Sequence, residues 1–220
     1  MSSTSLQLTA PLALLLALLL AACAQAPAPV VAPPELPAAA AQGLWTVDAG
    51  ASSLRILVLR GGRLAALGHN HVLGLPALRG GVQMPARLLD LSFRLDALEF
   101  DRPAWRAALG PDFASQPDAD AIAATRRNML IALEAERFPL VRLRARDPNG
   151  DGLRLELTLH GQTRVLTVPL QLDQQAHSLR ARSRFTIRQS DFGIQPFSVL
   201  GGLLAVQDEL RIEADLLLRP

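Results

Sequence analysis

Hydrophobic and polar residues alternate between Leu153 and Leu172, and this alternation is the clearest structural signal in the chain. Leucines occupy every second position from Leu153 to Leu159, and an apolar face resumes at Leu166 after a Gly161 turn. A period of two places such side chains on one face of a β-strand. The segment therefore predicts two antiparallel strands around a tight turn. Their apolar face must be covered by another layer, a core or a bound guest.

The same alternation recurs along the chain. Further strands are expected at residues 53–60, 89–95, 141–146, 179–188 and 209–218. A turn at 147–152 joins the strand 141–146 to the hairpin, which predicts three consecutive antiparallel neighbours. The spacing of hydrophobic residues changes in the middle of the chain from the strand period to that of a helix. Residues 103–109 are predicted to form a helical turn, and residues 118–133 a helix. Many short strands separated by turns favour a β-barrel or a β-sandwich with a mid-chain helical excursion.

The first 42 residues have a different composition. Residues 11–23 read PLALLLALLLAAC, an apolar run too short to span a bilayer comfortably and typical of a secretory signal peptide. The expected organisation is a signal peptide at 1–22, an Ala/Pro-rich tether at 23–42 and one folded domain at 43–220. Leu20-Ala21-Ala22-Cys23 resembles the lipobox of bacterial lipoproteins. That resemblance implies lipidation of Cys23 and a periplasmic protein anchored to the outer membrane. The alternative is ordinary cleavage with no lipid.

Composition argues against several classes of protein. The 22 basic residues are all arginine, against 20 acidic residues, and the net charge is only +2. These arginines are scattered and not interleaved with aromatic residues, so nucleic-acid binding is not expected. Cys23 is the only cysteine, so no intrachain disulfide forms. Without a G-x-S-x-G element or a recognisable nucleophile and base, the sequence does not predict an enzyme.

Gly68-His69-Asn70-His71 is the sharpest polar feature. Two histidines at positions i and i+2 share one face of a strand, at a spacing that can serve one metal ion, and His160 is a candidate third ligand. No acidic residue lies nearby in sequence to orient the imidazoles. A polar strand end or a hydrogen-bonded pair is therefore the competing interpretation. The alternative function that follows is a metal- or redox-linked envelope protein.

Several segments, taken in series, resemble the YceI-like family of periplasmic proteins. They are residues 44–48 (LWTVD), 127–130 (RNML), 137–139 (RFP), 157–163 (LTLHGQT), 185–194 (FTIRQSDFGI) and 206–212 (VQDELRI). The resemblance implies a lipocalin-like antiparallel closed β-barrel of about eight strands that binds an isoprenoid chain. A barrel of that size has room inside for either its own side chains or one ligand.

The function implied is noncovalent binding, sequestration or transport of an amphiphilic lipid in the bacterial cell envelope. The resemblance implies a bound polyisoprenoid or isoprenoid quinone. Such a tail can bind through apolar area alone, at about 0.8 kcal/mol per buried methylene. The expected cavity-lining residues are Phe93, Leu155, Leu157, Leu166, Val168, Phe185, Ile187, Ile212 and Leu216, with Phe192 and Phe197 at the mouth. A barrel filled by its own side chains, with a structural role in the envelope, is the other outcome. The oligomeric state stays open, a dimer included.

Overall fold

The computed structural model describes residues 43–76, 78–146 and 152–220, which lie within one compact unit, Pro37–Pro220. The expected signal peptide, tether and lipidation site at Cys23 lie outside the described residues, as does most of the turn expected at 147–152. Over the described ranges, no helix has the length and apolar character that crossing a membrane requires.

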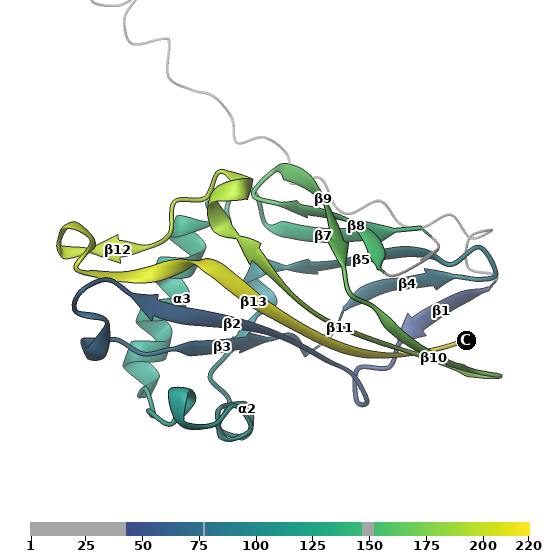
Figure 1. Ribbon diagram of the computed structural model, residues 1–220, viewed down its shortest axis with the longest axis horizontal. Coiled ribbons are helices and arrows are strands. Elements are labelled where there is room, and N and C mark those ends of the chain that lie inside the picture. The colour runs from purple at the N-terminus through teal and green to yellow at the C-terminus, as the bar shows by residue number, and fades with distance from the viewer. Residues whose placement is uncertain (1–42, 77, 147–151) are drawn as a thin grey trace, which may run out of the picture. The chain divides into compact units, whose positions relative to one another are not determined.

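Within the described residues, thirteen strands form one antiparallel sheet (Figure 1). The strands are β1 (Leu44–Val47), β2 (Ser53–Gly61), β3 (His71–Gly74), β4 (Arg79–Gln83), β5 (Leu88–Arg94), β6 (Glu99–Phe100), β7 (Leu140–Ala145), β8 (Leu153–Leu159), β9 (Gln162–Val168), β10 (Gln171–Gln175), β11 (Ser178–Arg188), β12 (Ser198–Val199) and β13 (Leu204–Arg219). Two α-helices, α2 (Pro103–Ala107) and α3 (Ala119–Ala132), separate β6 from β7. The expected mainly antiparallel β fold with a mid-chain helical excursion is confirmed.

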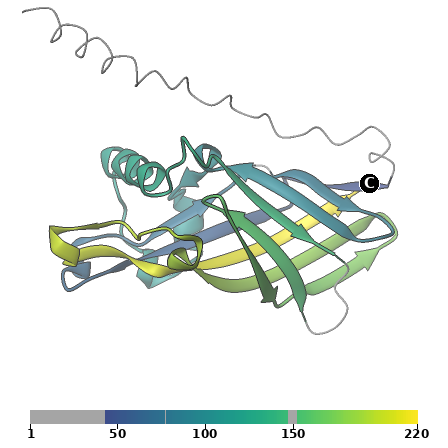
Figure 2. The ribbon, with the colours of Figure 1, turned by 90° about the horizontal axis from the view of Figure 1, so that it is seen from above.

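The sixteen-residue strand β13 organises the sheet. One of its edges pairs with β11, while the other pairs first with β2 and then with β1. From β1 the sheet continues through β4, β5, β7, β8 and β9, and from β2 it continues through β3 and β6. Figure 2 shows both branches curving away from this shared strand, so that their inner faces enclose a common interior.

The hairpin expected at 153–172 forms as predicted up to Val168, with β8 and β9 joined by a two-residue turn. The prediction is wrong for Gln171 and Leu172, which begin β10 and pair with β11 instead of β8. His160 and Gly161 have φ values of 52° and 69°, the left-handed conformation that a tight type I′ turn requires at both positions. Along β8, Leu155, Leu157 and Leu159 are buried and the residues between them face outward. The alternation seen in the sequence thus corresponds to the buried inner face and the exposed outer face of the sheet.

The expectation of a closed barrel of about eight strands is wrong in both strand number and closure. β1, β3, β4, β6 and β12 have only two to five residues each, too few for alternation to be recognised in the sequence. Among the described strands, β9 and β11 share no backbone ladder. β10 pairs with residues 178–182 of β11 and leaves the rest of that edge without a strand partner in the described part of the chain. Pro169, which has no N–H to donate, follows β9. Its carbonyl accepts from Ser183 Oγ at 2.6 Å, a side-chain bridge across the seam.

The helical excursion covers both faces of the β2–β3 branch. On the inner side, α3 begins at Asp118, whose Oδ1 accepts the backbone N–H of Ala121 at 2.8 Å as an N-cap. On the outer side, Trp105 and Phe113 pack against Leu57 and Val72. Figures 1 and 2 show α3 crossing β2 and β3 toward the end of the domain that carries the β12 loop.

Candidate functional site

A cavity of about 370 Å³ lies between α3 and the sheet. Its wall includes a row of residues that are register partners across four neighbouring strands, namely Phe185, Ile212, Ile56 and Leu73. Directly opposed residues of an antiparallel ladder project from the same face of the sheet. This row therefore forms a continuous apolar strip, and Met129 and Leu133 of the helical excursion face it from the other side.

A smaller cavity of about 110 Å³ occupies the other end of the sheet's interior. Its lining comes largely from the start of β8 and β11 and the end of β13, whereas the larger cavity lies toward the opposite ends of those strands. Leu143 and Phe185 border both cavities. These two side chains therefore separate the two cavities, which would otherwise form one long cavity.

Nine of the eleven residues predicted to contact a ligand border one of the cavities. The larger cavity is bordered by Phe93, Leu157, Phe185, Ile187, Phe197 and Ile212, and the smaller by Leu155, Val168, Phe185 and Leu216. Leu166 borders neither, and packs against the neighbouring core clusters. Phe192 also borders neither, because the turn after β11 buries its ring to 1% exposure. Of the two residues predicted at the mouth, Phe197 thus borders the larger cavity and Phe192 does not.

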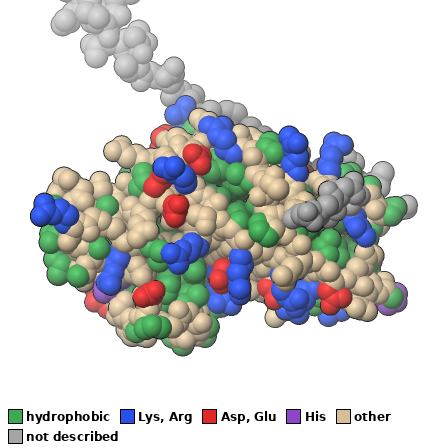
Figure 3. Space-filling model, in the orientation of Figure 1, with side chains coloured by type: hydrophobic (Ala, Val, Ile, Leu, Met, Phe, Trp, Pro, Cys, Tyr) green, Lys and Arg blue, Asp and Glu red, His purple; other side chains and the backbone are tan. Residues whose placement is uncertain are grey.

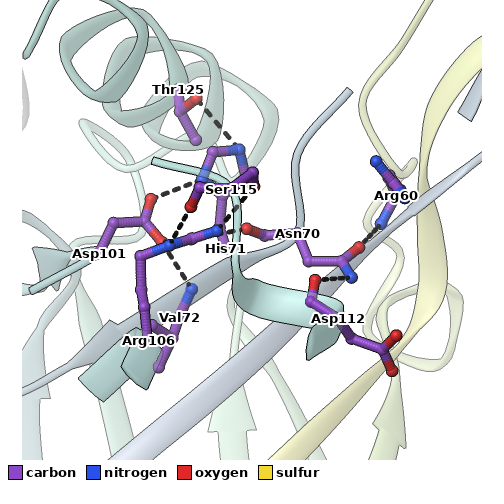
Figure 4. Close-up of polar contacts among 9 residues, drawn as sticks. All are labelled: Arg60, Asn70, His71, Val72, Asp101, Arg106, Asp112, Ser115 and Thr125. Atoms are coloured by element: carbon purple, nitrogen blue, oxygen red, sulfur yellow. Dashed lines mark hydrogen bonds and ion pairs between the residues drawn. The ribbon is translucent and has the colours of Figure 1, made fainter. Parts of the chain in front are cut away.

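The larger cavity has polar groups at one end. They are Arg60, His69, His71, Thr125, Asn128 and Gln189. His71 Nδ1 lies 2.6 Å from Asp101 Oδ2, and His71 Nε2 lies 3.5 Å from Thr125 Oγ1 (Figure 4). The imidazole therefore connects a buried carboxylate on one side to the cavity on the other.

Asp101 is the centre of a buried polar network. Its side chain is fully buried, and it accepts hydrogen bonds from His71 Nδ1, from the Val72 N–H at 3.0 Å and from Arg106. Burial raises the pKa of Asp101, but the hydrogen bonds from His71 and Val72 outweigh it and leave the pKa below its ordinary value. Because the carboxylate can only accept, His71 Nδ1 carries the proton in this bond. Nε2, on the other side of the ring, faces Thr125 Oγ1 and the cavity, where it is available for a hydrogen bond to a ligand.

Arg106 and Asn70 tie three segments of the chain to this network. The guanidinium of Arg106 is 1% exposed and donates to the carbonyls of Asn70 and Ser115, both at 2.8 Å. Asn70 Oδ1 accepts the Arg60 N–H at 3.0 Å, and Nδ2 donates to the Asp112 carbonyl at 2.9 Å. Figure 4 shows these groups converging on the short strand that carries His71. The Gly68–His71 element is therefore a structural junction beside the cavity.

The three histidines considered as metal ligands do not form a metal site. His69 precedes β3 and is exposed, and its ring centroid is 6.3 Å from that of His71. His160 instead contacts Glu134 Oε1 and donates from Nδ1 to the Phe192 carbonyl, each at 3.1 Å. Across the three described ranges, no three His, Cys, Asp or Glu side chains are grouped as metal ligands. The competing interpretation, hydrogen-bonded histidines, describes both His71 and His160.

Comparisons with known proteins agree with this architecture. The YceI-like domain model matches residues 45–218. A solved polyisoprenoid binding domain from Saccharophagus degradans, implicated in plant cell wall breakdown, is similar at 15% identity and a TM-score of 0.56, over 80% of this chain and 98% of that one. BcnA from Burkholderia cenocepacia is similar at 13% identity and a TM-score of 0.50, over 78% of this chain and 98% of that one. None of the curated proteins matches the chain. The family match spans nearly the whole described domain, and the chain therefore belongs to the YceI-like domain family.

Proposed function

We propose that the domain binds an amphiphilic lipid of the polyisoprenoid or isoprenoid quinone type, noncovalently and without catalysis. The observation that carries this proposal is the cavity of about 370 Å³, walled by aliphatic and aromatic side chains and polar only at one end. Small-molecule sites typically have volumes of about 300–1,000 Å³, apolar walls and a few polar groups. The ligand named for the similar Saccharophagus degradans domain belongs to the same chemical class.

The energetics of such a site favour a branched hydrocarbon tail. At about 0.8 kcal/mol per buried methylene, each five-carbon unit contributes about 4 kcal/mol before ordering costs are subtracted. With an association cost of at least about 4 kcal/mol, three buried units, which contribute about 12 kcal/mol, leave about 8 kcal/mol, which corresponds to micromolar affinity. This binding needs no directional contact along the tail, which agrees with the apolar wall formed by Phe185, Ile212 and Ile56.

The polar end of the cavity is suited to the ligand's head. Asp101 fixes the orientation of the His71 ring, so Nε2 and Thr125 Oγ1 both face the cavity, where a ligand hydroxyl can hydrogen-bond to them. A prenyl alcohol or a quinol has such a hydroxyl next to its apolar tail. We therefore place the head beside His71 and the tail along the wall toward Phe185.

Native mass spectrometry of residues 37–220, purified without detergent, tests the proposal. This fragment contains every described strand pairing and hydrophobic cluster, so it includes the whole folded core. We expect a copurified or added prenyl lipid at a stoichiometry of one. Ala132→Phe adds a ring to the cavity wall and should abolish this binding, whereas Ala123→Phe on the exposed face of the same helix should not. Equal binding by both variants would place the lipid elsewhere.

We also propose that the protein acts in the bacterial periplasm, held at the outer membrane by a lipid on Cys23. The support is the sequence alone, through the apolar segment before Cys23 and its lipobox-like ending. Metabolic labelling with a radioactive fatty acid should mark the wild-type protein and leave Cys23→Ala unmarked. Recovery of both forms in the soluble periplasmic fraction would contradict the anchor.

A further inference from the structure

Exposed hydrophobic side chains gather on two loops beside the cavity opening. Of the eight large hydrophobic residues that are exposed among those described, four lie on these loops. They are Leu67 at 74% exposure, Leu200 at 69%, Leu203 at 38% and Val199 at 37%. We call the two segments, residues 62–69 and 197–203, the mouth loops. Leu67 and Phe197 also border the larger cavity, so the mouth loops form part of its rim.

The mouth loops are held together as one surface. The Leu64 N–H donates to the Leu203 carbonyl at 2.8 Å. Gly62 has a φ of 84°, and a Cβ at this position would lie 2.4 Å from the same carbonyl oxygen, so glycine allows the two backbones to approach. Figure 1 shows the β12 loop and the loop after β2 at the same end of the domain. The domain's first strand pairs with the opposite end of β13, so this surface is separate from the point where Leu44 enters the sheet.

The mouth loops themselves carry basic residues and no acidic ones, while the exposed Asp112 lies next to them against Asn70. Residues 60–70 contain Arg60, Arg63 and His69 but no acidic residue, and residues 193–206 contain no charged residue at all. Arg63 is exposed and has no hydrogen-bonding or ion-pair partner among residues 43–76, 78–146 and 152–220. Figure 3 shows hydrophobic side chains beside basic ones at this end of the domain.

We propose that the mouth loops dock on the surface of a membrane that contains anionic lipids. Leucines at loop tips can enter the boundary between headgroups and acyl chains, where burial of their apolar surface is favourable. Arg63 supplies the complementary charge, since a basic residue near an anionic surface strengthens binding about fivefold. Docking in this orientation brings the cavity opening against the bilayer. This membrane docking goes beyond the proposed lipid binding, because adsorption of the mouth loops to a membrane surface does not require an occupied cavity.

Vesicle flotation of residues 37–220 measures this docking. The vesicles are phosphatidylcholine alone, or phosphatidylcholine with one quarter phosphatidylglycerol. We expect wild-type protein to bind the anionic vesicles, and Leu67→Ser/Leu200→Ser to lower its partition coefficient at least about tenfold. Arg63→Gln should lower binding about fivefold on anionic vesicles and leave binding to neutral vesicles unchanged. Leu88→Ser/Val165→Ser is the control, because it removes two exposed apolar side chains, at 39% and 52% exposure, away from the mouth loops and should have no effect.

Three results would overturn the proposal. They are absence of wild-type binding to anionic vesicles, an equal loss in the Leu88→Ser/Val165→Ser control, and a wild-type dimer that Leu67→Ser/Leu200→Ser converts to monomer in analytical ultracentrifugation. The last result would assign the surface to a second copy of the chain. Ala132→Phe separates this proposal from the proposed function, because the plugged protein should lose lipid uptake and keep vesicle binding.

Discussion

Asp101→Asn provides the sharpest test of the buried network beside the cavity. The substitution keeps the size of the side chain but removes the charge that faces Arg106, whose guanidinium is 1% exposed. It also replaces an acceptor with an amide that matches only part of the donor set of His71, Val72 and Arg106. The buried guanidinium is then left without its counter-charge, which is the costly outcome for a buried ion pair.

The expected loss of unfolding free energy is about 3–5 kcal/mol, the usual cost of removing one partner of a buried pair. A domain of this size has about 5–15 kcal/mol of stability in total, so the effect is a large fraction. With a urea dependence of about 2 kcal/mol per molar, the unfolding midpoint should fall by about 2 M. Tryptophan fluorescence is a suitable readout because Trp105 lies in α2 near the network.

Asp96→Asn is the matched control for this measurement. Asp96 pairs with Arg94, but both side chains are nearly half exposed, at 47% and 46%. Such a surface pair is worth at most about 1 kcal/mol. Asp101→Asn/Arg106→Met should be more stable than Asp101→Asn alone, because it removes the orphaned charge. If Asp101→Asn shifts the urea midpoint no more than Asp96→Asn does, the reasoning about the buried network is refuted.

Four further predictions concern pH, ligand recognition, loop packing and cavity length. Because the pKa of Asp101 lies below its ordinary value of 3.8, its contribution to stability is complete above about pH 5 and is lost as the pH falls through the unfolded-state and then the folded-state value, so urea titrations of wild type and Asp101→Asn should converge in acid. His71→Asn keeps a donor for Asp101 but removes the ring nitrogen that faces the cavity, so calorimetry should show weaker binding of a prenyl alcohol and unchanged binding of the corresponding hydrocarbon. Gly62→Ala should cost about 1–3 kcal/mol more in thermal unfolding than Gly110→Ala, since both have φ near 80° but only Gly62 faces a carbonyl at 2.4 Å; equal losses would contradict the packing argument. Phe185→Ala should join the two cavities, so native mass spectrometry should show a shift toward longer prenyl chains, and an unchanged chain-length preference would argue against the partition.

The long elements of this fold were predictable because their information is local. A strand of seven or more residues with one buried face carries its own alternation, as β8 does, and the helix α3 carries its own N-cap at Asp118. The strands β1, β3, β4, β6 and β12 were not recognised, because two to five residues cannot establish a period. Their existence depends on long neighbours that supply hydrogen-bonding partners.

Most of the cavity lining was also predictable, since inward positions of β8, β11 and β13 follow from the alternation once a common interior is assumed. Phe192 was misplaced because its position depends on the turn after β11, which directs the ring inward. Asp101 was missed as the partner of His71 because thirty residues separate them in sequence and only the pairing of β3 with β6 brings them together.

The amino-acid sequence by itself determined which residues form the longer strands and which side of each strand is apolar, because these properties depend on neighbours a few positions away. Only the tertiary structure decided that the sheet stays unclosed between β9 and β11, that Leu143 and Phe185 separate two cavities, and that the Gly68–His71 element joins a buried carboxylate network instead of a metal site. Each of these outcomes depends on contacts between segments distant in the chain. Such contacts are selected by the packing of the whole domain, and no local pattern records them.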